Sequence, residues 1–280
     1  MSKPFKIVID DKIPYTPNYA QHNIEAKVVA GAKISNEDLL DADALVVRTR
    51  TKVRPEILEG TKVKFVATAT IGFDHIDRNY LNEADIPWTN CPGCNSESVA
   101  QYFCSALFTI ADKYNWDVTQ KTLGVVGIGN VGSKVVKKAE ALGMKVVQCD
   151  PPRKEAEGLN HFVDLETLKK EADFITFHVP YTKEGENKTH HLVNEDFFKT
   201  AKKDLTLMNS SRGEVIDNLA LKNEMQNNSE IKAILDVWEG EPGIDPELLN
   251  LVDVATSHIA GYSADGKGKA AKGMMNEIAD

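Results

Sequence analysis

Short apolar runs alternate with amphipathic segments along most of the chain. Three early runs, at 5–9, 44–47 and 65–68, have the length and composition of buried strands, and a long helix is predicted at 97–113. Six later runs also predict strands, at 122–126, 145–149, 174–177, 205–208, 233–236 and 252–256. Strands that alternate with helices indicate the α/β class, with parallel sheets covered on both faces.

The number of predicted strands indicates two domains rather than one. A chain of 280 residues is long enough for two cores. The first three strands suit a small α/β domain, and the six later strands suffice for a complete dinucleotide-binding sheet.

Charge and composition exclude several classes of function. The net charge of -9 and the pI near 5.4 disfavour a nucleic-acid-binding surface, because phosphate backbones are bound mainly by clustered Lys and Arg. No apolar run approaches the roughly 18 residues of a membrane span, and the opening Met-Ser-Lys-Pro-Phe-Lys has no signal-peptide pattern. With only four cysteines, the expected location is the reducing cytoplasm.

A glycine fingerprint follows the predicted strand 122–126 directly. Residues 127–132 read Gly-Ile-Gly-Asn-Val-Gly and lead into a helical pattern. Gly127 permits a tight turn, Gly129 lets the backbone approach a pyrophosphate, and Gly132 allows close packing of helix on strand. The helix N-terminus then faces the negative charge of the ligand. This context predicts a dinucleotide site.

The next strand ends at Asp150, where a carboxylate can bind the adenosine ribose hydroxyls. Because a carboxylate repels the 2'-phosphate of NADP, NAD is the predicted cofactor. Arg153 could instead neutralise that phosphate, although Pro151 and Pro152 restrict how the chain turns toward it.

Three downstream residues have the chemistry needed to oxidise a 2-hydroxy acid. Arg212 can hold a carboxylate through two parallel hydrogen bonds, and it follows a strand, so it should emerge at the ligand-binding edge of the sheet. His258 also follows a strand and can accept a proton near neutral pH. Glu241 could fix the tautomer of His258, and its neighbour Glu239 is an alternative for that role. Each of these residues could also be an ordinary loop residue.

The pair Cys91 and Cys94 has the spacing of a redox motif and precedes a helix, whose N-terminus lowers a thiol pKa. The surrounding sequence offers no small redox domain, so structural thiols are favoured.

The motifs together resemble the D-2-hydroxyacid dehydrogenase superfamily, and within it the family of erythronate-4-phosphate dehydrogenases. The resemblance spans nearly the whole chain and is carried by the stretches 42–49, 64–75, 92–95, 150–153, 236–242 and 256–262. Asp-Val-Trp-Glu-Gly-Glu-Pro and Ser-His-Ile-Ala-Gly-Tyr resemble that family specifically.

The resemblance implies a catalytic set and a set of contacts. His258 would take the C2 hydroxyl proton, Arg212 would bind the substrate carboxylate, and Glu241 would complete the set. Cofactor contacts are expected at Gly127, Gly129, Asn130, Val131, Gly132, Asp150, Val179, Ser210, Ser211, Arg212, Asp236 and Gly261, and substrate contacts at Thr49, Thr70 and Tyr262. No metal is expected.

The substrate expected from the resemblance carries a dianionic phosphate, which needs cations and hydroxyl or amide donors. Arg48 is the cation expected to bind it, and Arg50 and Lys52 are further possibilities beside Thr49. An ordinary charged strand end is an equally good interpretation of these residues.

The expected architecture is two doubly wound parallel-sheet domains. A Rossmann NAD domain at 96–261 is inserted into a flavodoxin-like substrate domain made of 1–95 and 262–280. The resemblance also implies a C-terminal dimerisation domain, which is expected to be absent here because the chain is either truncated or a shorter variant; a homodimer is still expected.

The expected reaction is oxidation of 4-phospho-D-erythronate to (R)-3-hydroxy-2-oxo-4-phosphooxybutanoate in vitamin B6 synthesis. Two alternatives stay open: another D-2-hydroxyacid dehydrogenase, such as one for D-3-phosphoglycerate, and a non-catalytic protein that senses NAD(H).

Overall fold

The computed structural model describes residues 3–14, 22–158 and 161–279, which form two compact units. The N-terminal unit consists of Met1–Asn95 and Ser263–Asp280, and the central unit is Ser96–Tyr262. The first boundary coincides with the start of helix α4 (Ser96–Tyr114), and the second lies just before helix α11 (Ala264–Ala279).

The N-terminal unit contains a five-stranded parallel sheet with the order β2-β1-β3-β4-β5, which is the order of flavodoxin-like sheets. Its strands are β1 (Phe5–Asp10), β2 (Ile24–Val29), β3 (Ala44–Val47), β4 (Phe65–Thr68) and β5 (Trp88–Thr89). The strand predictions omitted β2 and β5. Both are edge strands: β2 is largely exposed and polar at alternate positions, and β5 has only two residues, so neither has the apolar run of a central strand.

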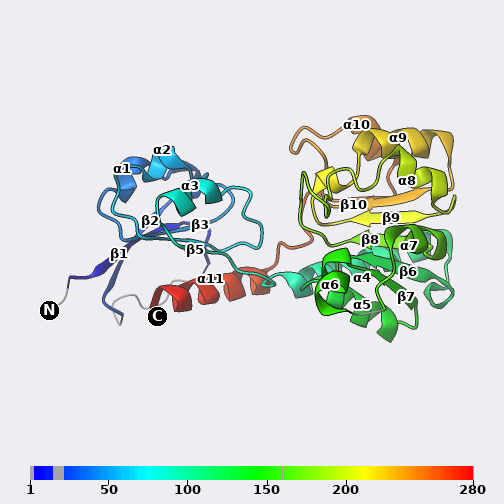
Figure 1. Cartoon of the computed structure of the whole chain (residues 1–280), viewed down its shortest axis with the longest axis horizontal. Coiled ribbons are helices and arrows are strands. Elements are labelled where there is room, and N and C mark those ends of the chain that lie inside the picture. Colours follow the sequence, from blue (N-terminus) through cyan, green and yellow to red (C-terminus); the bar gives the residue numbers. More distant parts are fainter. Residues whose placement is uncertain (1–2, 15–21, 159–160, 280) are drawn as a thin grey trace. The chain divides into compact units, whose positions relative to one another are not determined.

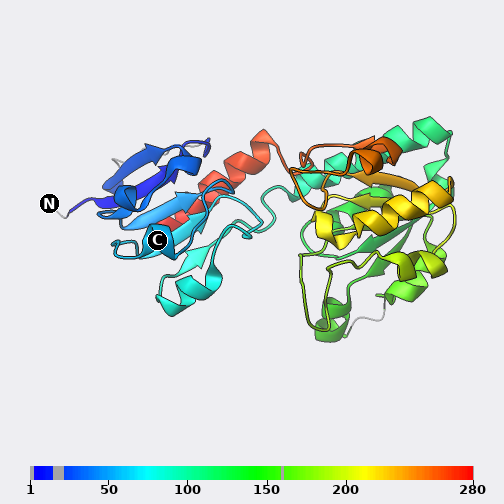
Figure 2. The ribbon, with the colours of Figure 1, turned by 90° about the horizontal axis from the view of Figure 1, so that it is seen from above.

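Helices cover both faces of this sheet (Figures 1 and 2). Helices α1 (Asn36–Leu39), α2 (Pro55–Leu58) and α3 (Arg78–Glu83) lie on one face, and α11 runs along the other. The division follows from the alternation of side chains along each strand: Leu45 packs with the three short helices, whereas its neighbour Val46 packs with Ala270 and Met274 of α11.

The central unit contains a six-stranded parallel sheet with the order β11-β10-β9-β8-β6-β7. Its strands are β6 (Thr122–Val126), β7 (Lys145–Cys149), β8 (Phe174–Phe177), β9 (Thr206–Asn209), β10 (Lys232–Leu235) and β11 (Val254–Ala255). Phe162 forms an isolated parallel bridge with Gln148 of β7. If the bridge at Phe162 is counted as a further strand beside β7, the strand order matches that of the usual dinucleotide-binding sheet. The order reverses between β6 and β8.

Two layers of helices enclose this second sheet (Figure 1). Helices α4 and α5 (Gly132–Ala141) share one core cluster, and the opposite cluster includes side chains from four others: α7 (Leu165–Glu171), α8 (Glu195–Thr200), α9 (Asn218–Asn227) and α10 (Pro246–Leu251). These four begin at Asp or Asn side chains that accept backbone N–H groups, as does α6 (Pro151–Glu157). The prediction of two doubly wound parallel sheets is therefore confirmed.

Among the residues that the structure describes, no helix combines the length and the apolar character that a transmembrane span requires.

Candidate active site

The predicted catalytic and cofactor residues of the central unit follow the carboxyl ends of its parallel strands. Such ends meet at one edge of a sheet, where open α/β folds bind ligands. Gly127 follows β6, Asp150 follows β7, Val179 follows β8, Arg212 follows β9 and His258 follows β11. The sheet therefore brings the predicted residues to a common edge.

His258 and Glu241 form a hydrogen-bonded pair at this edge. The Nδ1 atom of His258 lies 2.9 Å from Oε2 of Glu241, and the other carboxylate oxygen accepts the backbone N–H of Trp238 at 2.8 Å. The His258 side chain is half exposed. An ionised Glu241 holds a proton on Nδ1, so Nε2 keeps the lone pair that can accept a proton from a ligand.

Glu239, the alternative partner for the histidine, lies in a different network. One of its oxygens faces Nε2 of His191 at 2.5 Å, and the other accepts the N–H of Asn218 at 3.1 Å. The structure therefore pairs His258 with Glu241.

The loop that carries His258 is held by the buried carboxylate of Asp236. That carboxylate accepts the hydroxyl of Thr256 and the backbone N–H groups of Ile259 and Ala260, and the carbonyl of Asp236 accepts the N–H of His258. Tyr102 of α4 lies 2.6 Å from the Thr256 hydroxyl. Asp236 was predicted to contact the cofactor, and that role stays a prediction. The hydrogen bonds of its side chain that the structure describes are to the loop that carries His258.

The turn that carries Arg212 is fixed by Asn209 at the end of β9. The buried amide of Asn209 accepts the N–H and the hydroxyl of Ser211 and donates to the carbonyl of Arg212. The guanidinium of Arg212 donates to the Ser211 carbonyl at 2.7 Å and is half-buried. Ser210 has a buried Oγ with no hydrogen-bond partner among the described residues.

The glycine loop has the form that a dinucleotide requires. Gly127 has a φ of +87°, and a Cβ there would lie 2.5 Å from the carbonyl oxygen of His178. A Cβ on Gly132 would overlap the carbonyl of Gly127. Around Gly129, in contrast, no described atom lies within 4 Å of the Cβ position, so the backbone is open to a ligand. Asn130 is exposed and Val131 half-buried beside it.

Asp150 lies directly under this loop. Its Oδ2 accepts the N–H of Ile128 at 2.7 Å, and its Oδ1 caps α6 by accepting the N–H of Arg153. The guanidinium of Arg153 donates to both oxygens of Glu157 and to the carbonyl of Ile128. Since Glu157 already neutralises Arg153, the local charge favours NAD over NADP.

The predicted substrate residues of the N-terminal unit follow β3 and β4, which are neighbours in the sheet. Arg48 has a buried Nη1 atom with no partner among the described residues, and Thr49 is exposed. Arg50 differs, because it forms ion pairs with Asp10 and Asp11. The suggestion that Arg50 binds a phosphate is therefore not favoured, since its charge is already neutralised.

Thr70 ends a chain of buried polar groups. Its hydroxyl lies 2.7 Å from that of Thr68, which lies 2.8 Å from Nε2 of His75, and Thr70 donates to the carbonyl of Gly72. These bonds restrict the orientation of the Thr70 hydroxyl. Of the other predicted contacts, Gly261 is half-buried and Tyr262 is 67% exposed, both in the central unit.

Cys91 and Cys94 are unsuited to redox catalysis. Burial raises the pKa of the Cys94 thiol to about 12 and also raises the pKa of Cys91. Both therefore stay protonated near neutral pH, and the thiol form is a poor nucleophile. We expect iodoacetamide to alkylate them at least about tenfold more slowly in the folded protein than in urea, as followed by mass spectrometry. Equal rates would show reactive thiols.

Glu241 and His258 also line a pocket of about 570 Å³ in the central unit. Its other lining side chains are mainly apolar, among them Trp238, Ile244 and Leu249. Among the described residues, the lining contains no Lys or Arg.

Three residues that support the site were absent from the predictions: Asn209, Thr256 and His75. For Asn209 and Thr256 the available signal was their position, because each is a polar residue at the carboxyl end of a strand or directly after it; His75 lies beyond the end of β4 and has no such signal. Asn209 is hydrogen-bonded to Arg212, which is close in sequence, whereas Thr256 contacts Tyr102, which is distant in sequence.

Residues 106–260 match the family model for the NAD binding domain of the D-isomer specific 2-hydroxyacid dehydrogenases. A protein of Bacteroides thetaiotaomicron named erythronate-4-phosphate dehydrogenase is 49% identical over 98% of this chain and 79% of its own length. One of the same name from Proteus mirabilis is 43% identical over 98% of this chain and 73% of its own length.

Two solved structures show the same fold. The NAD-bound 3-phosphoglycerate dehydrogenase of Entamoeba histolytica has a TM-score of 0.84 and 26% identity, and the match covers 99% of this chain and 95% of that one. The D-lactate dehydrogenase of Aquifex aeolicus, complexed with NAD and lactic acid, has a TM-score of 0.80 and 27% identity, covering 98% and 94%.

Proposed function

The chain belongs to the D-isomer specific 2-hydroxyacid dehydrogenase family, and from this membership we propose that it oxidises 4-phospho-D-erythronate to (R)-3-hydroxy-2-oxo-4-phosphooxybutanoate. It is an NAD-dependent oxidoreductase that acts on a CH–OH group. The proposed substrate is the one in the name of relatives that are 41–49% identical to this chain. The step belongs to vitamin B6 synthesis.

The structural observation that supports dehydrogenase chemistry is the hydrogen bond between His258 and Glu241, whereas the choice of substrate rests on the relatives. Oxidation of the substrate breaks the O–H and C–H bonds at C2, so one proton and one hydride must leave. The free Nε2 of His258 takes the proton, and the resulting imidazolium is stabilised by Glu241. NAD, when bound, supplies the hydride acceptor.

Arg212 binds the substrate carboxylate in this proposal. A guanidinium matches a carboxylate through two parallel donors, which fixes the C2 centre as well as its charge. The cofactor is held by Gly127–Gly132, Asp150 and the hydroxyl of Ser210, which has no hydrogen-bond partner among the described residues. We also assign Val179, Ser211, Asp236 and Gly261 to the surroundings of the cofactor, as the resemblance implies.

We assign the N-terminal unit to substrate binding. Arg48 is the cation proposed for the phosphate, because its buried Nη1 lacks a partner among the described residues, whereas Arg50 is paired with two aspartates. Thr49, Thr70 and Tyr262 complete the proposed substrate contacts. We further propose a homodimer that needs no metal and contacts no membrane. The acidic chain fits the expectation that it binds no nucleic acid, and its four free cysteines fit the cytoplasm.

Replacing Asp150 with Ser tests the assignment of the cofactor. We expect the ratio of kcat/KM for NAD to that for NADP to fall by about tenfold or more, because a charge-assisted bond is lost and repulsion of a 2'-phosphate is removed. Steady-state rates with both cofactors measure this ratio. Asp164→Ser is the matched control, since Asp164 caps α7 in the same way. An unchanged ratio would remove Asp150 from cofactor selection.

The decisive experiment for the function is NADH formation by the purified protein with NAD and 4-phospho-D-erythronate, compared with D-3-phosphoglycerate and D-lactate. A parallel assay includes a 2-oxo acid as an added electron acceptor. Preference for the erythronate supports the proposal. Preference for another acid keeps the dehydrogenase and changes its pathway, and no turnover by a folded, NAD-binding protein favours a sensing role.

A further inference from the structure

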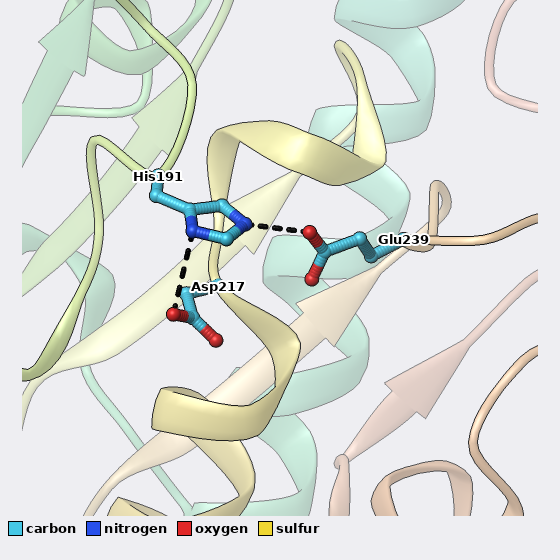
Figure 3. A group of neighbouring side chains, drawn as sticks. All are labelled: His191, Asp217 and Glu239. Carbon is cyan, nitrogen blue, oxygen red and sulfur yellow. Dashed lines mark hydrogen bonds and ion pairs between the residues drawn. The ribbon is translucent and has the colours of Figure 1, made fainter.

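Three side chains from three separate loops meet beside the candidate active site (Figure 3). The ring of His191 lies between two carboxylates: its Nε2 is 2.5 Å from Oε1 of Glu239, and its Nδ1 is 3.4 Å from Oδ2 of Asp217. His191 lies between β8 and α8, Asp217 precedes α9 and Glu239 follows β10. All three side chains are about one-quarter to one-third exposed.

Each carboxylate also binds the start of α9 through its remaining oxygen. Asp217 accepts the N–H groups of Leu219 and Ala220, and Glu239 accepts the N–H of Asn218. The oxygens that face His191 are the ones left over from these bonds. Through Asp217 and Glu239, the His191 ring is therefore linked to the N-terminus of α9 and to the loop that follows β10.

The geometry indicates a ring in direct contact with two carboxylates rather than a metal centre. A Zn²⁺ ion held by Nε2 and a carboxylate oxygen, each about 2.0–2.2 Å from it, would keep those two atoms about 3.3 Å apart in a tetrahedral site. The observed separation of Nε2 and Oε1 is 2.5 Å, and the second carboxylate faces the opposite ring nitrogen. Nε2 of His191 is hydrogen-bonded to Glu239, and Nδ1 lies within ion-pair distance of Asp217.

The backbone of His191 is also fixed. Its φ of +52° lies in the left-handed region, which is uncommon for a residue with a side chain. Its N–H donates to the carbonyl of Glu214, and its own carbonyl accepts the side-chain amide of Asn194. The strained conformation is thus stabilised by bonds on both sides, as expected where the direction of a side chain matters.

The two segments joined by this cluster carry the predicted catalytic residues. Glu239 is two positions before Glu241, whose carboxylate binds the N–H of Trp238. Gly213 follows Arg212, and a Cβ there would overlap the peptide between Trp238 and Glu239. The backbone beside Arg212 is therefore in direct contact with the turn that leads to Glu241.

We propose that His191, held between Asp217 and Glu239, is a positioning residue that keeps the side chains of Glu241 and Arg212 in the relative positions that the reaction requires. This inference rests on the proposed function. His191 does not touch the reacting atoms; it acts through the turn at Trp238 and through the segment from Arg212 to Asp217. Displacement of that turn would leave the cofactor loop intact and would slow the chemical step.

The test compares His191→Leu and His191→Gln with wild type. We expect kcat and the single-turnover rate of NADH formation to fall by about tenfold in His191→Leu, with the Kd for NAD within about twofold. Gln can still donate to Glu239, so it should recover part of the rate. His190→Leu is the matched control, since His190 stacks on the same ring without facing either acid.

A double-mutant cycle that combines a His191 variant with Glu239→Gln tests whether His191 and Glu239 act as one unit. If His191 acts through Glu239, the double variant loses about as much rate as either single variant, rather than the product of the two losses. Multiplicative losses, or an unchanged single-turnover rate in folded His191→Leu and His191→Gln, would overturn the proposal. Loss of wild-type activity to a chelator with recovery by Zn²⁺ would also overturn it. The proposed function fails separately, if wild type does not turn over 4-phospho-D-erythronate.

Discussion

The variant His258→Asn is expected to bind NAD and to have almost no turnover. General base catalysis by a positioned side chain contributes about 10²–10⁴ to a rate, and an amide cannot take up the proton that His258 accepts. Asn is the right replacement because His258 has a φ of +57°, and Asn tolerates this left-handed conformation better than most residues. The loss of rate will then report chemistry rather than a distorted loop.

The measurements are the steady-state rate of NADH formation, the Kd for NAD by calorimetry and the thermal midpoint. We expect the Kd to stay within about twofold of wild type, because the described hydrogen bonds of His258 are to Asp236 and Glu241 rather than to the glycine loop. His161→Asn is the control, since His161 is exposed and belongs to a different part of the central unit. Turnover by His258→Asn above about one-tenth of wild type would exclude His258 as the base.

The strands at the centres of the sheets could be predicted from sequence because burial on both faces gives continuous apolar runs. The predictions for the inner strands β3, β4, β6 and β8 match the structure residue for residue, and so does the prediction for β7 at the end of its sheet. The edges were less predictable. The run at 252–256 forms a strand only at Val254–Ala255, since Val252 instead caps the end of α10.

The family and the cofactor could also be predicted, because they depend on local motifs. The glycine fingerprint, Asp150 and the stretches near the end of the chain led to a superfamily that the comparisons confirm, along with NAD. The roles of individual residues remain predictions. For Glu241 and Glu239, the residue chemistry alone offered two acids two positions apart, and the resemblance favoured Glu241; the contacts of the folded chain pair His258 with Glu241 and His191 with Glu239.

The supporting network was beyond sequence reasoning for a physical reason. His191 and Glu239 are separated by 48 positions, and Tyr102 and Thr256 by 154. Neither pair has a periodic or local signature, because each depends on which loops the parallel sheet brings to the same edge. Polar residues at the ends of apolar strands are the useful signal in such folds, even when their partners cannot be named.

Glu241→Gln is expected to be nearly as damaging as loss of the histidine itself. Gln can keep the bond to the N–H of Trp238, so the turn should be preserved. Its amide nitrogen would then face Nδ1 of His258, which must become an acceptor, and the ring proton would move to Nε2. A ring in that tautomer cannot take the substrate proton. We therefore expect kcat to fall by about 10²–10⁴, as it does when the orienting acid of a catalytic triad becomes an amide.

The rate of NADH formation measures this loss, and Glu247→Gln is the matched control. Glu247 is an exposed acid of α10 whose partner is Lys222, so its loss should change kcat by less than about twofold. A Glu241→Gln enzyme that keeps a third or more of the wild-type kcat would contradict the orienting role. In that case His258 would remain the base, but another group would have to set its tautomer. The reason is that Glu241→Gln changes only the atom that faces Nδ1 of His258.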